Sequence, residues 1–340
     1  MTQSRTGGPR TGGPQTRRTR ALVAVVLAVA LALFAGGLWV GSDDAKPYRG
    51  GPVSISTGVP SGVYYRYGQL LAPRLEADLG VPVTIDASAG SVDNVRRLID
   101  GTHTLAIATA DAVADLSPAE RDQLRAIARL YDDYVQLVVP VSSPARSVAD
   151  LRGKRVGIGP PASGVQLLAN RILATAGLDA RTDLVATEDG IGDTAAKLRD
   201  GRLDAFFWSG GLPTEAVRVL AEEADIRFVP LGDVAATLRD RYHQVYREAV
   251  IPSDAYQAGR TLPGVRQEVP TVAVPNLLVT RADTDPDLIR RVTGTVMGGR
   301  EAIGREVHAA QLVDPRTAIL TFPPLLLHEG ARLWYRSAKP

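Results

Sequence analysis

Residues 53–67 read VSISTGVPSGVYYRY, and this stretch decides the fold. The β-branched residues of 53–57 are typical of a strand, and the Gly, Pro and Ser of 58–62 predict a tight loop. Tyr64 and Tyr67 then begin a helical spacing of apolar residues that continues beyond the quoted stretch. A strand, a Gly-containing loop and a helix in this order form the unit from which parallel sheets with crossover helices are built.

The same alternation recurs along the chain from Pro52 onward. Further strands are predicted at 81–87, 105–108, 155–158, 203–207 and 271–280, and helices are predicted to start near Ser91, at the capping box Ser117–Glu120 and at Ser163. Residues 98–101, Leu-Ile-Asp-Gly, precede one strand, and residues 198–201, Leu-Arg-Asp-Gly, precede another. This echo predicts an α/β protein with two similar lobes.

The apolar run 135–139 and the Ser-Pro turn that follows it predict a crossing from the first lobe to the second. The strand 271–280 contains Pro275, which belongs on an edge, at a bulge or in a hinge, so we interpret it as the return crossing, paired with 135–139. We therefore predict three folded segments: the first part of lobe 1 at 42–139, lobe 2 at 140–250, and a hinge return with the completion of lobe 1 at 251–340.

The composition is that of a globular protein large enough for two cores, with 340 residues of which 45% are hydrophobic and 22% charged. The first twenty residues hold five Arg and no acidic residue, so the remainder is close to neutral and offers no basic face for nucleic acid. The chain has no Cys, which excludes disulfides, thiolate metal sites, a Cys nucleophile and an acceptor for lipid attachment.

The N-terminal sequence predicts that the protein is attached to a membrane. Residues 1–20 are expected to form a disordered basic cytoplasmic tail, and 21–41 a transmembrane signal anchor, because the uncharged apolar run is long enough to span a bilayer. The Arg residues before the run orient it with the large domain outside the cell. A cleaved signal peptide, with cleavage near Ser42 and secretion of the domain, is the alternative.

Polar loops follow several predicted strands, at the edge where α/β sheets bind ligands. A plain turn with an N-cap is the expected explanation of any one loop alone, but together the loops indicate a shared cleft that binds an anion with backbone N–H groups and hydroxyls. The predicted ligand-binding residues are Thr57, Gly58, Tyr64, Ser91 and Asn94 from lobe 1, and Ser163, Gly164, Ser209, Gly211 and Thr214 from lobe 2.

Charged residues near these loops are weaker candidates. Arg66 or Arg129 could pair with a ligand carboxylate, although a structural role is expected for each. Asp111 follows a strand end and could order its loop or receive an ammonium group, and the loop role is the expected one.

Enzyme motifs are lacking in the sequence. Residues 159–164 have the glycine spacing of a phosphate loop, but Val165 and Gln166 stand where Lys and Ser or Thr would be required. The four His residues, at 103, 243, 308 and 328, show no metal-ligand spacing. We therefore expect no enzymatic activity, no cofactor and no metal.

In order along the chain, the motifs resemble those of the TAXI family, the extracytoplasmic solute receptors of TRAP-type secondary transporters. The matching segments are 56–58, 62–68, 90–94, 153–157, 163–164, 200–207, 211–214, 269–275 and 328–331. The resemblance implies a two-lobed periplasmic-binding-protein-like (type II) fold with a hinge, and a ligand such as glutamate or another organic acid. The chain departs from the family's usual Gly-Gly-Thr at 61–63 and from its Gly-Ser-Gly-Thr-Glu at 162–166.

The leading functional hypothesis is an extracytoplasmic receptor, held at the cell membrane, that captures a small organic anion and delivers it to a TRAP-type permease. The alternative is a membrane-anchored sensing or interaction module with the same fold and no transport role. The Val residues at positions 63 and 165, where the family usually has Thr, are compatible with this alternative.

Overall fold

The computed structural model describes residues 48–256, 267–321 and 325–338. The predicted tail 1–20 and the predicted membrane anchor 21–41 lie outside these ranges. Within the described ranges, no helix combines the length and the apolar character needed to cross a bilayer.

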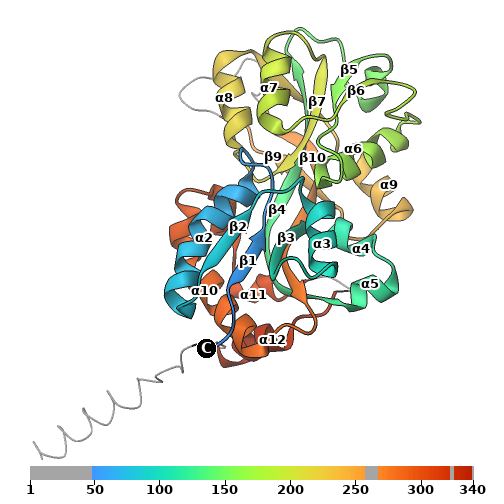
Figure 1. Ribbon diagram of the computed structural model, residues 1–340. Helices are drawn as coiled ribbons and strands as arrows, with labels where there is room; N and C mark the ends of the chain where they lie inside the picture. Colours follow the sequence, from blue (N-terminus) through green and yellow to red (C-terminus); the bar gives the residue numbers. More distant parts are fainter. Residues whose placement is uncertain (1–47, 257–266, 322–324, 339–340) are drawn as a thin grey trace, which may run out of the picture. The chain divides into compact units, whose positions relative to one another are not determined.

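The described residues form a mixed β-sheet with helices packed around it (Figure 1). The strand order is β2-β1-β3-β10-β4-β7-β5-β6, with β8 also paired to β4 and β9 to β10. The strands are β1 (Val53–Ser56), β2 (Val83–Asp86), β3 (Leu105–Thr109), β4 (Leu124–Pro140), β5 (Arg155–Gly157), β6 (Val185–Thr187), β7 (Ala205–Gly210), β8 (Ile226–Val229), β9 (Arg247–Ile251) and β10 (Val269–Arg281).

Helices connect the strands. The α-helices are α2 (Val63–Leu79), α3 (Ser91–Ile99), α4 (Ala110–Ala114), α5 (Pro118–Asp122), α6 (Gly164–Thr175), α7 (Ile191–Arg199), α8 (Glu215–Glu223), α9 (Val234–Arg241), α10 (Pro286–Gly304), α11 (Pro315–Ala318) and α12 (Glu329–Ser337). Two 3₁₀ helices, η1 (Val148–Leu151) and η2 (His308–Leu312), complete the described elements.

Two parallel groups of strands flank a pair of long antiparallel strands. β2, β1 and β3 run parallel, and with α2, α3, α10 and α12 we call them the first half. β7, β5 and β6 also run parallel, and with α6, α7 and α8 we call them the second half. β10 pairs antiparallel with β3 and β4, and β4 pairs antiparallel with β7, so these two strands join the halves (Figure 1).

Local sequence signals set the helix ends. α2 buries Tyr67, Leu71 and Leu75, which lie on one face at a spacing of four residues, and it ends where Gly80 takes a φ of 71° and its N–H bonds the Glu76 carbonyl at 2.8 Å. The echo seen in the sequence is confirmed, because α3 and α7 both end at an Asp followed by a left-handed Gly, at φ 69° in one and 68° in the other.

The return strand β10 pairs with β4, as predicted, but in a different register. Residues 273–281 lie against 134–124 of β4, whereas 134–138 of β4 pair with β7. The predicted partner 135–139 is therefore wrong, because β8 occupies that edge of β4 at 137–140, where Leu137 and Val138 pair with β7 on one side and β8 on the other. The expected irregularity at Pro275 is confirmed by a shift of register between Pro275 and Leu277.

Two apolar clusters form the core. Tyr67, Leu71 and Ile55 belong to a buried cluster between α2, the β1–β3 strands and α10. Phe206 and Phe207 belong to a second cluster, which extends from the second half along β4 and β10 and reaches Leu98 of α3 and Ala106 of β3. Burial of apolar area at about 25 cal/mol per Å² stabilises each cluster, and the second cluster packs the two halves against each other.

Candidate ligand-binding site

A small cavity lies where the two halves meet, beside β4. Its volume is about 50 Å³, which is room for roughly four water molecules. The first half lines it with the loop after β1, the start of α2, the loop before α3 and Thr109 at the end of β3. The second half lines it with the loop before α6 and with the last residues of β7. The sheet edge at which ligands were expected is therefore the edge that carries the cavity.

Six of the ten residues predicted to bind ligand line this cavity. They are Gly58, Tyr64, Ser91, Ser163, Gly164 and Ser209. The structure thus brings together, from both halves, residues that are far apart in the sequence.

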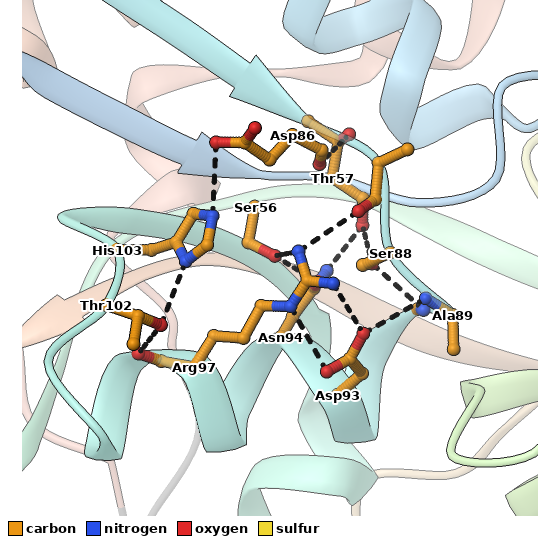
Figure 2. A network of polar contacts seen from close by, with 12 residues as sticks. Ser56, Thr57, Asp86, Ser88, Ala89, Asp93, Asn94, Arg97, Thr102 and His103 are labelled. Carbon is orange, nitrogen blue, oxygen red and sulfur yellow. Dashed lines mark hydrogen bonds and ion pairs between the residues drawn. The ribbon is translucent and has the colours of Figure 1, made fainter.

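Thr57 and Asn94 do not line the cavity, because their polar atoms hold the first half together (Figure 2). The Thr57 hydroxyl donates to the Asp86 carbonyl at 2.8 Å. The buried Asn94 amide accepts from the Ser56 hydroxyl at 2.6 Å and donates to the carbonyls of Thr57 and Ile107. Asn94 therefore ties α3 to β1 and β3, and the prediction that these two residues face the ligand is not met at this cavity.

Figure 2 also shows how the loop before α3 is fixed. The Asp93 carboxylate accepts from the Ala89 N–H at 3.1 Å and from Arg97. The Ser88 hydroxyl donates to the Thr57 carbonyl at 3.1 Å and accepts from the Gly90 N–H at 3.0 Å. The start of α3 is consequently held in place by bonds made before any ligand arrives.

Gly211 and Thr214 also lie off the cavity lining. The Thr214 hydroxyl accepts from the Trp208 indole N–H at 2.9 Å and donates to the Gly211 carbonyl at 2.8 Å. A Cβ at Gly211 would lie 2.5 Å from the Cβ of Ala309, so this glycine permits close packing. The segment after β7 therefore positions Trp208, whose ring lines the cavity, rather than presenting its own polar groups there.

Three helices, α2, α3 and α6, begin at the cavity, and each follows one of the loops predicted to bind ligand. The first N–H groups of a helix have no acceptor within the helix, and its N-terminus carries a partial positive charge. Ser163 caps α6 as predicted, accepting from the Gln166 N–H at 3.0 Å. Ser91 was expected to cap α3, but Gly90 takes that position, and the Ser91 hydroxyl instead accepts from the Thr109 N–H across to β3 at 3.1 Å.

Two hydroxyls of the lining have no hydrogen-bond partner. Thr109 Oγ1 and Ser209 Oγ are both buried, in residues that are 1% and 7% exposed, and neither bonds to another group of the protein. Buried polar atoms without a partner are rare in folded proteins because each one costs roughly 1–3 kcal/mol. Both residues line the cavity, one from each half, so a bound molecule that reached these hydroxyls would supply the missing hydrogen bonds.

Asp133 is the one ionisable carboxylate in the lining, and the sequence reasoning did not identify it. It lies on β4, is 3% exposed and accepts from the Asn276 amide at 2.6 Å. Burial, together with the nearby carboxylates of Asp132 and Asp111, raises the pKa of Asp133 to about 7. A buried group with a strongly shifted pKa at a cleft is typical of a functional site.

The arginines and the acid considered from the sequence are engaged elsewhere. Arg66 forms an exposed ion pair with Glu306, and Arg129 bonds Asp132 at 2.7 Å; neither lines the cavity. Asp111 is buried against Arg171 and the Tyr246 hydroxyl, so it orders the junction between α4 and α6 rather than receiving a ligand. The lining contains no Lys, Arg or His side chain.

Direct contacts close the cavity on the side of α3 and α6. The Asp93 N–H of the first half donates to the Ala162 carbonyl of the second half at 3.0 Å. A Cβ at Gly164 would lie 2.9 Å from Ser91 Oγ and 3.3 Å from Thr109 Oγ1, so only glycine permits this approach. The described conformation therefore has the two halves in contact beside a small, partly open cavity.

This architecture is an α/β fold of the periplasmic-binding-protein type. Residues 55–338 match the model of the NMT1-like family, and the chain belongs to that family. Among solved structures, it is similar to PhnD1 of Prochlorococcus marinus in complex with methylphosphonate, with a TM-score of 0.50, 11% identity and coverage of 76% of this chain and 89% of that one.

Two further structures match at lower TM-scores. The alkanesulfonate-binding protein SsuA of Xanthomonas axonopodis pv. citri, bound to MOPS, has a TM-score of 0.48 at 17% identity and covers 86% of this chain and 85% of its own. A putative L-cystine ABC transporter protein of Listeria monocytogenes has a TM-score of 0.49 at 14% identity and covers 78% of this chain and 99% of its own.

Proposed function

We propose that this protein is an extracytoplasmic solute receptor, which encloses a small molecule between its two halves and presents it to a membrane transporter. The observation that carries the proposal is the cavity itself, where two unpartnered hydroxyls, a buried carboxylate and three helix starts converge from both halves. Membership of the NMT1-like family and the fold agree with a binding role. The proposal includes no catalytic step.

In this proposal the two predicted lobes, with boundaries at 139 and 250, move relative to each other. β4 and β10 are the two strands that connect the halves, and the bulge at Pro275 is a place where β10 departs from a regular ladder. Opening would break the bond between Asp93 and Ala162 and expose the cavity to solvent. Binding would restore it, because the ligand contacts groups of both halves only when they are together.

A TRAP-type permease is the proposed partner, on the strength of the TAXI-like motifs at 56–58, 90–94 and 269–275. Attachment to the membrane through 21–41 belongs to the same proposal, with the large domain outside the cell. The alternative, a sensing or interaction module that binds no ligand, is less well supported, because a module without a ligand has no use for buried hydroxyls left unpartnered.

The proposal is tested by isothermal titration calorimetry on the purified full chain, against amino acids, carboxylates, phosphonates and sulfonates. We expect saturable binding of at least one class, with a Kd in the micromolar range or below, which corresponds to about 8 kcal/mol or more. Native mass spectrometry of the freshly purified chain provides a second measurement. A correctly folded chain that carries no small molecule and binds none of the panel would contradict the receptor role.

A further inference from the structure

We propose that Asp133 binds a protonated amine, and that the ligand is a small zwitterion of the α-amino acid type, with its carboxylate at the helix starts of α2, α3 and α6. This inference rests on the proposed receptor function and narrows its ligand. Of the two ligand types expected from the sequence, a glutamate-like amino acid or a simple carboxylate, it favours the amino acid.

The first step is the position of the carboxylate. Asp133 lines the cavity from β4, the strand that joins the halves, and the residue is 3% exposed. Its neighbour Asp132 points to the other face of the strand, where it bonds Arg129 at 2.7 Å and also pairs with Arg247. The two arginines that pair with Asp132 therefore lie on the side of β4 away from the cavity. The hydrogen-bond partners of Asp133, on the cavity side, are neutral groups.

The second step is a count of protons. Asp133 Oδ1 accepts from the Asn276 amide at 2.6 Å, whereas Oδ2 has only the Tyr64 hydroxyl, at 3.5 Å. That hydroxyl has a single proton, and it donates it to the Asn276 side-chain oxygen, which is its closest contact. Asp133 Oδ2 consequently has no committed donor, and it faces a cavity.

The third step is the charge balance. Across residues 48–256, 267–321 and 325–338, Asp133 forms no ion pair with Lys, Arg or His, and the lining has none of these residues. A buried carboxylate without a cation is costly, so either it is protonated or a cation from outside joins it. A primary ammonium group provides both the charge and the donor that Oδ2 lacks.

The fourth step concerns the rest of the ligand. The starts of α2, α3 and α6 offer N–H groups and partial positive charge, and the unpartnered Thr109 and Ser209 hydroxyls are donors within the same space. The helix starts of the lining thus suit a carboxylate while Asp133 suits an amine. A volume of about 50 Å³ favours the smallest amino acid, glycine, and a longer side chain would require a wider separation of the halves.

The inference is tested by calorimetry on the full chain with three matched sets: glycine, L-alanine and L-glutamate; glycolate, L-lactate and 2-hydroxyglutarate, which replace the amine by a hydroxyl; and methylamine, which lacks the carboxylate. We expect amino acids to bind at least tenfold more tightly than their hydroxy analogues and than methylamine, since a charge-assisted bond contributes about 1.5–3 kcal/mol. Asp133→Asn should weaken amino-acid binding at least tenfold and leave the hydroxy acids within threefold.

Asp132→Asn is the matched control, because it removes the same charge one residue away, off the cavity lining. It should change amino-acid affinity by less than threefold, and circular dichroism should show both variants folded. Equal binding of amino and hydroxy acids, or undiminished amino-acid binding by Asp133→Asn, overturns the ammonium site while the receptor function stands. Absence of binding by every member of this panel and of the wider one contradicts both.

A second readout is the dependence of affinity on pH between 6 and 8, where the ligand itself does not titrate. The ionisable groups that act on Asp133 are Tyr64, Tyr131 and Asp111, together with Asp132 on the other face of β4, and burial raises the pKa of both tyrosines. Because Asp133 has a pKa of about 7, it must lose its proton to bind an ammonium group, so affinity should rise several-fold from pH 6 to pH 8. Asp133→Asn should abolish this slope, and a slope that persists in the variant would overturn the assignment.

Discussion

Gly164→Ala tests whether the described contact between the halves is the closed state of a receptor. The new methyl carbon would lie 2.9 Å from Ser91 Oγ and 3.3 Å from Thr109 Oγ1, both across the junction. Overpacking of this kind costs about 1–3 kcal/mol, and here separation of the halves at this junction would relieve it. The closed state should therefore become less favourable by that amount, which is roughly a fivefold to hundredfold change in the equilibrium.

Amide hydrogen exchange measures this effect without any ligand. The Asp93 N–H is protected by the Ala162 carbonyl of the other half, at 3.0 Å, so its exchange reports on opening. In Gly164→Ala, the Asp93 amide should exchange at least fivefold faster, and any ligand that binds the wild type should bind correspondingly less tightly. The thermal midpoint should hold or rise, because Ala is favoured over Gly in a helix by about 1 kcal/mol.

Gly298→Ala serves as the matched control, since Gly298 lies in α10 and a Cβ there meets no atom within 4 Å. It should leave both the exchange of the Asp93 amide and ligand affinity unchanged. If Gly164→Ala behaves like this control, or if it destabilises the whole molecule without affecting the junction, the interpretation of the contact as a closed state is refuted.

Four further outcomes follow from the same structure. Ala162 has a φ of 62°, so Ala162→Gly should relieve left-handed backbone strain. Because Gly is also more flexible than Ala in the unfolded chain, the net gain in the free energy of unfolding should be about 0.5 kcal/mol, measured by urea denaturation. The pKa of Asp133 is raised from 3.8 to about 7 in the folded protein. Without ligand, the wild type should therefore lose up to about 4 kcal/mol of unfolding free energy relative to Asp133→Asn as pH rises from 4 to 8. If the unfolding free energies of the two proteins change in parallel with pH, Asp133 is not a buried acid. Asn94→Ala should lower the free energy of unfolding by about 2–4 kcal/mol, because it leaves a hydroxyl and two carbonyls without their hydrogen-bond partner. A loss below about 1 kcal/mol in chemical denaturation would show that the Asn94 hydrogen bonds are dispensable. Ser209→Ala should leave stability unchanged or higher by up to about 1 kcal/mol while it weakens solute binding several-fold, and a variant that is less stable with normal affinity would mean that the hydroxyl has a structural role.

Local signals in the sequence predicted the local features of the fold. The Leu98–Gly101 and Leu198–Gly201 stops, the Ser117 capping box and the Ser163 cap all depend on residues within a few positions of each other, and all are present in the structure. The register of β10 was not predictable in this way, because it depends on β8, a strand from another part of the chain, pairing with residues 137–140 of β4.

Only the part of the site that is formed by loops could be predicted from the sequence. Six of its lining residues follow strand ends, where polar residues before a helix are visible in the sequence. Ser91 was given the wrong role because its hydroxyl is drawn to the Thr109 amide, a contact between distant segments. Asp133 was missed because two adjacent acids in a strand look alike in the sequence, and only the positions of Arg129 and Arg247 show which one is paired.

The strand order has a consequence for how the molecule can be made. β10, at 269–281, is inserted between β3 and β4, so the first half lacks its central neighbour until nearly the whole chain has been synthesised (Figure 1). The strands β5, β6 and β7 and their helices have no such gap and can associate earlier. As the chain emerges during synthesis, assembly would thus begin in the middle of the chain, and the N-terminal strands would wait for a late segment. A truncation before residue 269 should leave β3 with an unpaired edge, and such edges promote aggregation.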